Sequence, residues 1–486
     1  MADTDGLNEN HYSNARPLDV HTWSEYPEVN EFVDQVFKMI KGFKGNQSIG
    51  KKLSKVLLLD LYVAWCGDPT LKLMISRNNN SYQASSRYNA LFISRKIVDL
   101  VDFLIGAGLI HQKDGFNDRL SGVGYQSRIW PANDLIGLFE QARFSQFMIE
   151  NFIERETVIL RDKDKKVEEY PDSDETNRMR SILRDYNQLL SNTFIDIPSL
   201  ETPALIMGEG TRKTTMQINQ KGKLVHRIFN NSLFTQGGRF YGGWWQRCPK
   251  GYRSEITMDG VPTSEIDYSG LHIVILYAQA GINYWAEVNE DPYLIEGIAD
   301  LDPAINLRSA AKILMLTAIN AEDNRKTFGA FRQQAETSSA EKKLTDEVLG
   351  RILSQLKRKH APIAHKIASG AGIDLMYVDS QITEIITQRF TERGIPMLSV
   401  HDSYIVPFGY DHFLRETMDA AFEQVTGVTH PLVSHTGDYP ENLVPVEEMV
   451  ASQQISDRHI RDLDLFRQFK GKGDRPDWIP VLNQFY

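Results

Sequence analysis

A strand pattern gives way to a helix pattern within the stretch Glu265-Ile-Asp-Tyr-Ser-Gly-Leu-His-Ile-Val-Ile-Leu-Tyr-Ala278. The isoleucine and tyrosine on either side of Asp267 are good strand formers, whereas the apolar run from Leu271 onward suits a buried helix. The Ser269-Gly270 pair between them is a turn signal. The pattern therefore predicts a strand that brings the Asp267 carboxylate to a tight turn, followed directly by a helix.

A second acidic turn lies far downstream, in Ile395-Pro-Met-Leu-Ser-Val-His-Asp-Ser-Tyr-Ile-Val-Pro407. This segment is typical of a hairpin with His401-Asp402 at its tip. Two strands that each carry one aspartate would make a two-metal site for phosphoryl transfer, with the carbonyl oxygen of Tyr268 as a further ligand. The expected cofactor is a pair of Mg²⁺ ions, with Mn²⁺ as the alternative.

These segments resemble the catalytic palm motifs of family A DNA polymerases and of the related phage-type single-subunit RNA polymerases. Asp267-Tyr-Ser-Gly-Leu-His272 is similar to the first metal-binding motif. Val400-His-Asp-Ser403 is similar to the second, and its serine is closer to the RNA polymerase version. Three more segments lie in the order that the family has: Gly238-Arg-Phe-Tyr241, Arg308-Ser-Ala-Ala-Lys312 of the fingers helix, and Asp379-Ser-Gln381 before the hairpin.

The resemblance implies an α+β fold with a right-hand polymerase core, an antiparallel palm sheet and reduced fingers. It also implies template-directed nucleotidyl transfer, in which nucleoside triphosphates are joined into a polynucleotide. Arg308 and Lys312 are one helical turn apart, so both can reach one triphosphate, and Lys312 can protonate the leaving pyrophosphate. The further roles implied are metal binding by Asp267, Tyr268 and Asp402, sugar contacts by His272 and Asn320, and substrate contacts by Arg239 and Gln381.

The chain departs from the family in two places. The fingers helix of the relatives ends in an aromatic residue and a glycine, where this chain has Asn320-Ala321. His272 stands where the DNA enzymes have the glutamate that excludes a ribose 2′-hydroxyl, so the sugar preference stays open. Two other functions therefore remain. One is a non-catalytic winged-helix DNA-binding protein of a mobile element or defence system, with a degenerate polymerase fold, and the other is a template-independent nucleotidyltransferase.

The segment Gly237-Gly-Arg-Phe-Tyr-Gly-Gly-Trp-Trp-Gln-Arg247 combines paired glycines, arginines and aromatic residues. Paired glycines let a backbone approach a ligand closely, and arginines among aromatic residues are typical of a surface that binds bases and phosphates. Arg239 is the residue expected to contact a phosphate or a primer–template. The alternative is that Trp244 and Trp245 belong to the core.

Residues 47–140 have the order of a winged-helix domain. Helices are predicted over Leu53–Trp65 and Ser94–Leu109, and a hairpin follows that reaches Trp130. In such a domain one helix enters a major groove of DNA. The basic residues expected to contact DNA are Arg95, Lys96, Arg119 and Arg128. The alternative is a structural three-helix module or a wing that binds protein.

The rest of the chain divides into four further segments. Residues 1–46 are a polar N-terminal segment, 141–225 a helical connector with thumb-like character, 226–440 the palm and fingers, and 441–486 a loosely packed C-terminal extension. In the connector we expect a hairpin over Thr157–Val167 and a helix over Asp174–Leu190. Residues 321–343 are polar and predict a mobile loop.

The chain has 486 residues, a formal net charge of -10 and two cysteines. The negative net charge argues against binding of nucleic acid through the overall charge of the protein, but it allows a local basic channel. Two cysteines exclude a disulfide framework, and the N-terminus lacks a signal-peptide pattern, which indicates a reducing, cytoplasmic setting. The apolar runs are too short to span a bilayer. The expected partners are therefore nucleic acid, DNA or alternatively RNA, and nucleoside triphosphates, with no membrane.

Overall fold

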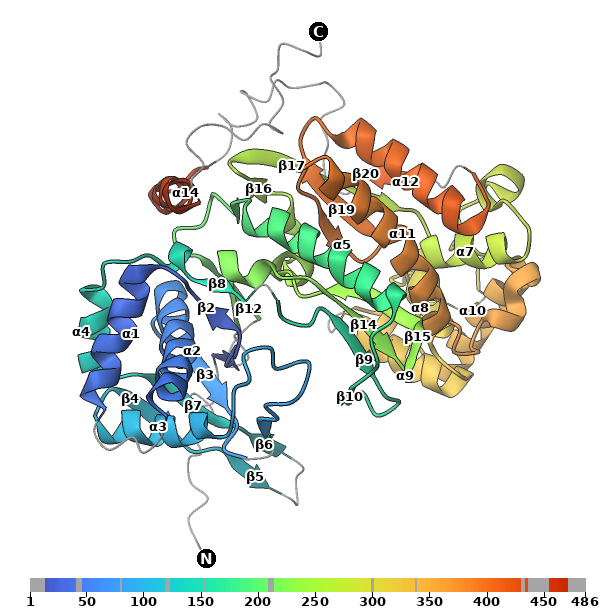
Figure 1. Ribbon diagram of the computed structural model, residues 1–486. Helices are drawn as coiled ribbons and strands as arrows, with labels where there is room; N and C mark the ends of the chain where they lie inside the picture. The colour runs from blue at the N-terminus through green and yellow to red at the C-terminus, as the bar shows by residue number, and fades with distance from the viewer. Residues whose placement is uncertain are drawn as a thin grey trace, which may run out of the picture.

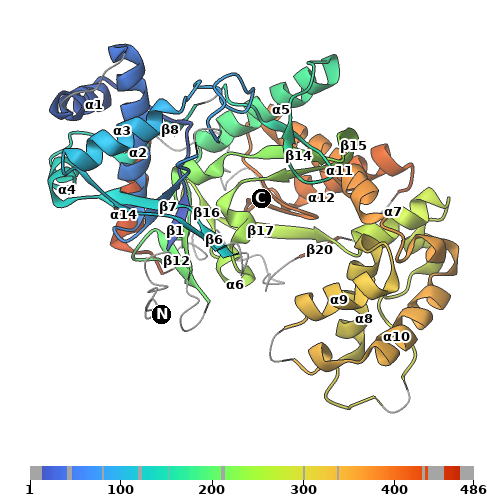
Figure 2. The ribbon, with the colours of Figure 1, turned by 90° about the horizontal axis from the view of Figure 1, so that it is seen from below.

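The computed structural model of the chain describes residues 14–40, 46–78, 81–118, 123–152, 154–208, 214–298, 301–336, 339–429, 433–435 and 454–470. The fold is mixed α+β, with two four-stranded sheets and one six-stranded sheet among these residues. Figures 1 and 2 show the N-terminal domain at one end of the molecule and the helices of residues 307–359 at the other. Within the described residues, no helix is long and apolar enough to cross a membrane.

The N-terminal domain packs four helices around a sheet. Helix α2 (Gln47–Gly67) is its central element, because its apolar side chains from Leu53 to Ala64 are all buried, and Asn46 caps its first turn. The other helices are α1 (Pro27–Met39), α3 (Lys96–Gly106) and α4 (Asn133–Glu140). The sheet order is β1 (Ala15–Pro17), β3 (Lys72–Ile75), β7 (Ser127–Pro131) and β4 (Ile110–Lys113), and β5 (Phe116–Asp118) pairs with β6 (Val123–Tyr125) between β4 and β7.

The six-stranded central sheet carries both acidic turns. Its order is β11 (Ile195–Asp196), β16 (Thr257–Met258), β17 (Val261–Tyr268), β19 (Ser403–Pro407) and β18 (Leu398–Val400), while β20 (Val433–His435) also pairs with β17. All these pairings are antiparallel. Strand β17 continues through Gly270, at φ +69°, into helix α7 (Leu271–Gln279), which confirms the predicted strand, turn and helix. Helix α12 (Asp411–Thr426) packs against β17 and β19.

A second sheet carries Arg239. Its order is β10 (Val167–Glu168), β9 (Val158–Arg161), β14 (His226–Asn230) and β15 (Leu233–Tyr241), and helix α11 (Gly372–Glu392) packs on β15. Both elements predicted for the connector are present: the β9–β10 hairpin and helix α5 (Asp174–Ser191), which Ser173 caps. Shorter elements are the pair β2 (Thr22–Trp23) and β8 (Glu150–Asn151), the pair β12 (Ala204–Met207) and β13 (Thr214–Gln217), and helix α6 (Lys250–Arg253).

Helices α8 (Leu307–Asn320), α9 (Asn324–Gln334) and α10 (Asp346–Lys359) form the end of the molecule opposite to the N-terminal domain. Helix α8 contains Arg308 and Lys312 and ends at Asn320, as predicted, and Asn306 is its N-cap. The prediction of a mobile loop over residues 321–343 is wrong for the part that forms α9. This helix is capped by Asp323 and buries Phe328 and Phe331, an apolar pair that the polar composition of the segment hides.

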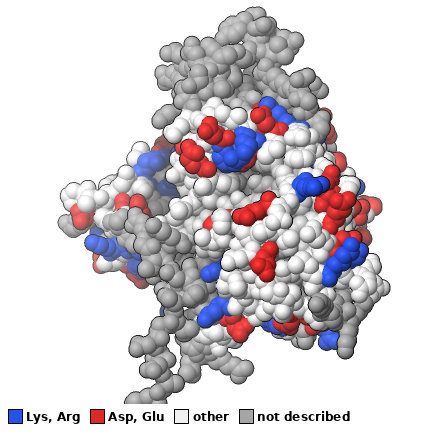
Figure 3. Space-filling view, turned by 90° about the vertical axis from the view of Figure 1, so that its left-hand side faces the viewer, with Lys and Arg blue, Asp and Glu red and all other residues white. Residues whose placement is uncertain are grey.

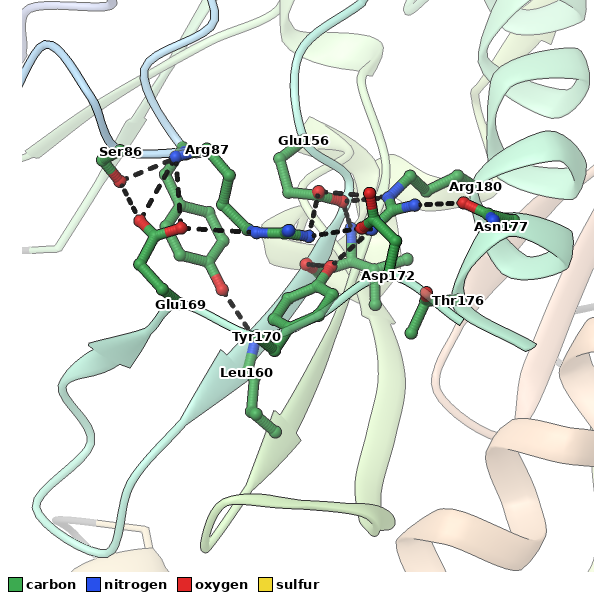
Figure 4. Close-up of polar contacts among 12 residues, drawn as sticks. Ser86, Arg87, Glu156, Leu160, Glu169, Tyr170, Asp172, Thr176, Asn177 and Arg180 are labelled. Atoms are coloured by element: carbon green, nitrogen blue, oxygen red, sulfur yellow. Dashed lines mark hydrogen bonds and ion pairs between the residues drawn. The ribbon is translucent and has the colours of Figure 1, made fainter. Parts of the chain in front are cut away.

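A polar cluster joins the N-terminal domain to the connector (Figure 4). Arg87, in the segment that precedes α3, lies 3.2 Å from Glu156 and 3.1 Å from Asp172. Arg180 of α5 lies 3.1 Å from the same Glu156. The guanidinium of Arg87 also lies 3.8 Å above the ring of Tyr170. Because these charges are shared between segments, the domain is fixed to α5 and β10.

The C-terminal helix α14 (Asp457–Phe469) is firmly packed, contrary to the expectation of a loose extension. Arg458 lies 2.8 Å and the Nδ1 atom of His459 2.6 Å from the carboxylate of Asp196, and all three side chains are buried. A buried ion pair of this kind fixes the position of the helix on β11.

Candidate active site

The two aspartates of the motifs lie side by side. Asp267 pairs with Ser403 across β17 and β19, and Asp402 occupies the adjoining turn. The backbone N–H of Tyr268 donates to the carbonyl oxygen of Asp402 over 3.2 Å. His401 has φ +57°, so the turn is tight and directs Asp402 next to the end of β17. The antiparallel register therefore produces the arrangement that the sequence predicts.

The electrostatics of this pair are unusual. Burial, followed by the negative charges of Asp402 and Glu265, raises the pKa of Asp267 to about 7, although Lys312 lowers it. Burial and the neighbouring Asp379 also raise the pKa of Asp402. Two carboxylates this close do not both ionise readily unless a cation compensates them. The arrangement therefore favours a bound positive charge.

The donor chemistry fits magnesium. Among the described residues, no three His, Cys, Asp or Glu side chains gather into a ready-made metal site. However, Mg²⁺ is usually held by only one or two carboxylates and keeps waters or substrate phosphates as its other ligands. The Oδ1 atom of Asp267 is buried and has no hydrogen-bond partner within the described residues, so an oxygen ligand is available. Asp267, Asp402 and the carbonyl of Tyr268 remain the residues that would bind the ion.

A third carboxylate, Asp379 of α11, lies next to the pair. Its Oδ2 atom accepts a 2.6 Å hydrogen bond from Nε of Arg239 and lies 3.9 Å from Nε2 of His272. Nη2 of Arg239 is 2.9 Å from the same His272 nitrogen. A guanidinium has only donors, so His272 accepts there and carries its ring proton on Nδ1. The expected phosphate contact, Arg239, is therefore paired inside the protein in this structure.

The charge of Asp379 is stabilised in this cluster. Its burial alone would raise its pKa, but the charge of Arg239 and the hydrogen bond that Arg239 donates outweigh burial and lower it. The sequence interpretation selected Gln381 from this segment and missed Asp379. The only signal in the sequence is the spacing, which puts Asp379 and Thr383 one helical turn apart on one face of the helix. In the structure both side chains are buried, and the hydroxyl of Thr383 lies 2.9 Å from the hydroxyl of Tyr404.

Gln381 itself faces another cavity. It lies two positions, or about 200°, around α11 from Asp379. It lines a cavity of about 390 Å³ together with Glu175, Tyr377 and Gln424. Its Nε2 atom is 3.4 Å from the hydroxyl of Tyr377. The structure thus brings Asp379, and not Gln381, next to Asp402.

Helix α8 presents both basic residues of its motif. Arg308 and Lys312 are exposed, and the Lys312 charge acts on the pKa of Asp267. Both cations lie over the ring of Tyr293, at 5.9 and 5.8 Å from its centre, and Arg308 also contacts Asp291 at 2.5 Å. The expectation of one shared basic face is therefore confirmed.

Tyr293 is a site residue that sequence reasoning missed. It is 5% exposed, and a Cβ atom added to Gly270 would lie 3.7 Å from its hydroxyl. Burial, followed by the charges of Asp402 and Asp291, raises its pKa. Tyr293 therefore lies between the acidic turn and α8. No motif marks it, because its neighbours are distant in sequence.

Asn320 lies at the far end of α8, eight residues or about 12 Å along the helix from Lys312. Its Nδ2 atom donates to the carbonyl of Leu316 over 2.7 Å. It lines a cavity of about 360 Å³ between α8 and α9, next to Ala321. Its expected contact with a sugar stays a prediction.

The serine of the second motif supports the sheet. The Oγ atom of Ser403 donates to Glu265 over 2.6 Å, and Arg253 forms a two-point ion pair with the same carboxylate at 3.0 and 3.1 Å. The negative charge of Glu265 is thus balanced by an arginine of the protein, whereas no such ion pair balances the charge of Asp267 within the described residues.

The glycine pair before Arg239 has a structural role. Both Gly237 and Gly238 have positive φ, and β15 is irregular there. A Cβ on Gly238 would lie 2.8 Å from Oγ of Ser380, so the pair lets β15 approach α11 and not a ligand. The alternative interpretation of the tryptophans is correct, because Trp244 and Trp245 are 2% and 0% exposed.

The basic residues of the N-terminal domain differ in their exposure. Arg95 and Lys96 are exposed at the start of α3. Arg128 is 4% exposed and donates to the carbonyl of Gln126, so it is not presented for a DNA contact. Arg119 lies outside the described residues. The face shown in Figure 3 mixes Lys and Arg with Asp and Glu, so DNA binding there would not come from one broad basic surface.

No protein-family model matches the chain, and no curated protein matches it. Among solved structures, the chain is similar to the POL domain of Pol1 from M. smegmatis in complex with DNA primer-template and dNTP. The two are 12% identical, the match covers 84% of this chain and 68% of that chain, and the TM-score is 0.30. A TM-score this low assigns neither fold nor function, so the interpretation depends on the residues of the site themselves.

Proposed function

We propose that the chain is a template-directed nucleotidyltransferase with a right-hand polymerase core and reduced fingers. The observation that carries this proposal is the pairing of β17 with β19, which sets two poorly compensated aspartates beside each other. The exposed Arg308 and Lys312 add the cationic surface that a triphosphate requires. The motif resemblance and this geometry support the same assignment.

The residues would divide the chemistry among them. Asp267, Asp402 and the carbonyl of Tyr268 would hold two Mg²⁺ ions, or Mn²⁺ ions. Such ions activate a 3′-hydroxyl and neutralise charge that develops on the phosphates. Arg308 and Lys312 bind and orient the triphosphate, and Lys312 donates a proton to the departing pyrophosphate. His272 is held by Arg239 and meets the sugar.

The proposed partner is a nucleic acid, DNA or RNA, bound in part by a winged-helix domain. The order α2, β3, α3, β4, β7, with β7 between β3 and β4, supports this assignment. In this arrangement α3 would enter a groove, with Arg95 and Lys96 at its start reaching phosphates.

An incorporation assay tests the proposal. Wild-type protein is incubated with labelled nucleoside and deoxynucleoside triphosphates, Mg²⁺ or Mn²⁺, and primed and unprimed templates. Asp267→Asn and Asp402→Asn should each abolish incorporation and leave DNA binding intact. Asp185→Asn, at an exposed position of α5, is the matched control and should behave as wild type.

The outcomes of this assay distinguish the candidate functions. Near wild-type incorporation by either aspartate variant would overturn the assignment. Incorporation without a template would favour a template-independent transferase. DNA binding with no incorporation by the wild type would favour the non-catalytic DNA-binding protein.

A further inference from the structure

A short loop, residues 290–293, lies between the acidic turn at Gly270 and helix α8, and we call it the Tyr293 loop. Its backbone is held by buried side chains of neighbouring elements. The hydroxyl of Tyr284 donates to the carbonyl of Glu290 over 3.0 Å, and Nε2 of His360 lies 2.8 Å from the carbonyl of Pro292. Tyr284 and His360 are 1% and 0% exposed. The loop therefore has a fixed position beside the proposed active site.

Asp291 of the loop connects Tyr293 to helix α8. Its Oδ1 atom accepts from the backbone N–H of Tyr293 over 2.8 Å, and its Oδ2 atom accepts from Nε of Arg308 over 2.5 Å. The cations of Arg308 and Lys312 lie over the ring of Tyr293, at 5.9 and 5.8 Å from its centre. The ring thus supports both basic residues that the proposed function assigns to the triphosphate.

The hydroxyl of Tyr293 lies on the other side, at the acidic turn, where a Cβ atom on Gly270 would be 3.7 Å from it. Burial, and after it the charge of Asp402, raises its pKa, so the hydroxyl stays protonated and can donate. It has no hydrogen-bond partner within the described residues. It is not enclosed either, in contrast to Nε1 of Trp285, which has neither a partner nor contact with solvent. The Tyr293 hydroxyl is therefore a donor that a ligand can use.

The surroundings of this hydroxyl fit a chain of phosphates. Asp267 and Asp402 lie on one side and favour a bound divalent cation, and the exposed Arg308 and Lys312 lie on the other. A ligand that reaches both sides needs several anionic oxygens in a row. Phosphate oxygens share magnesium ions with carboxylates, and they accept strong hydrogen bonds from hydroxyl groups. A base or a sugar offers no such series of anionic oxygens.

We propose that Tyr293 binds the β- and γ-phosphates of the incoming nucleoside triphosphate, with its hydroxyl donating to a phosphate oxygen beside the two aspartates. This assignment rests on the proposed function for the position of the substrate. The ring and the hydroxyl have separate roles, because the ring supports Arg308 and Lys312 while the hydroxyl contacts the ligand itself. The same contact holds the pyrophosphate before it leaves.

The test measures binding of inorganic pyrophosphate with Mg²⁺ by calorimetry, which requires neither a template nor catalysis. Tyr293→Phe keeps the ring and removes the donor. It should weaken pyrophosphate binding about tenfold, because a hydrogen bond to a charged group is lost. Tyr293→Leu also removes the ring from under both cations, and it should weaken binding by about a further threefold.

Stability measurements separate this role from a structural one. Because the Tyr293 hydroxyl bonds to no described residue, Tyr293→Phe should have the urea midpoint of the wild type. Tyr62→Phe, in the N-terminal domain, is the matched control. Tyr62 is buried and its hydroxyl donates to the carbonyl of Phe144 over 3.1 Å, so this variant should lose stability and keep pyrophosphate binding.

The incorporation assay adds a kinetic measurement. Tyr293→Phe should raise KM for the triphosphate about tenfold and change kcat by less than about threefold, because the contact exists before and after the transfer. A lower urea midpoint with unchanged pyrophosphate affinity would make Tyr293 a structural residue and overturn the inference. Weaker duplex binding with unchanged pyrophosphate affinity would place a nucleic-acid phosphate at the hydroxyl and overturn it as well.

Failure of the inference and failure of the proposed function give different results. If the wild type incorporates nucleotides and Tyr293→Phe binds pyrophosphate equally well, only the inference about Tyr293 fails. If no incorporation occurs, but the wild type binds pyrophosphate and Tyr293→Phe weakens that binding, the phosphate site stands and the proposed function fails. No pyrophosphate binding by the wild type would overturn the inference.

Discussion

Fully buried and half-buried aspartates occur in two different settings in this chain. Asp60 is fully buried, and its oxygens lie 2.8 and 2.9 Å from Arg16 and 2.9 Å from Lys221. Asp267 and Asp402 lie beside each other instead, and no Lys or Arg within the described residues forms an ion pair with either of them. The first arrangement fixes a domain, and the second leaves negative charge available for a ligand.

The largest expected effect is on stability at Asp60. Asp60→Asn leaves two cations without their carboxylate and should reduce the free energy of unfolding by about 3–5 kcal/mol. Asp402→Asn relieves repulsion and should leave it unchanged or raise it. Urea denaturation of both variants measures the difference. Equal destabilisation by the two substitutions would show that Asp402 is a structural residue like Asp60.

The second effect is the pH dependence caused by Asp267. Its pKa is raised to about 7 in the folded chain, so between about pH 4 and pH 7 the folded state binds more protons than the unfolded state. The free energy of unfolding should therefore fall as pH rises through this window. After allowance for solvent screening, Asp267→Asn should be more stable than wild type at pH 8 by on the order of 1 kcal/mol, and equal to it at pH 4. A constant difference across this range would contradict the coupling of Asp267 to Asp402.

The third effect is sugar selection by His272. Its Nε2 atom is occupied by Arg239, so its Nδ1–H can donate to a 2′-hydroxyl. His272→Ala should lower ribonucleotide use relative to deoxynucleotide use about fivefold, the size of one hydrogen bond, and His272→Glu should also shift preference toward deoxynucleotides. Competition between the two nucleotide types in one reaction measures this ratio. Strong selection for deoxynucleotides by both wild type and His272→Ala would remove His272 from the role.

The smallest effect concerns the N-terminal domain. Arg95→Glu with Lys96→Glu should weaken duplex binding and reduce the slope of log affinity against log salt by about 2, because each lost phosphate contact contributes about 0.9. Lys38→Glu on α1 is the control for net charge in the same domain. The substitutions are made in the full chain, because Asp60 and Arg87 tie this domain to the rest. An unchanged slope would favour a protein-binding role.

Local patterns in the sequence predicted much of this structure. The strand and turn at Asp267, the hairpin at Asp402 and helix α8 were predicted because each depends on residues close in sequence. The pairing of Arg239 with Asp379 was not predicted, because these residues are 140 positions apart in the sequence. The position of Tyr293 was not predicted either, because it depends on the packing of a loop against helix α8.

The same distinction explains the remaining errors. Arg128 was expected at the surface because a single sequence shows the charge of a strand residue but not which face it occupies. Helix α9 was missed because two buried phenylalanines decide it within a polar segment. Tertiary packing overrides local composition in such places.

The most direct test of the central claim is a calorimetric Mg²⁺ titration at pH 7 in buffers of different ionisation enthalpy. If the uncompensated pair Asp267 and Asp402 is a cation site, wild-type protein binds Mg²⁺ and releases a fraction of a proton, because the ion displaces the proton that repulsion retains on Asp267. Asp267→Asn and Asp402→Asn should lose the binding and the proton release, and Asp185→Asn should keep both. Equal Mg²⁺ binding by wild type and both site variants, or none by the wild type, would contradict the account.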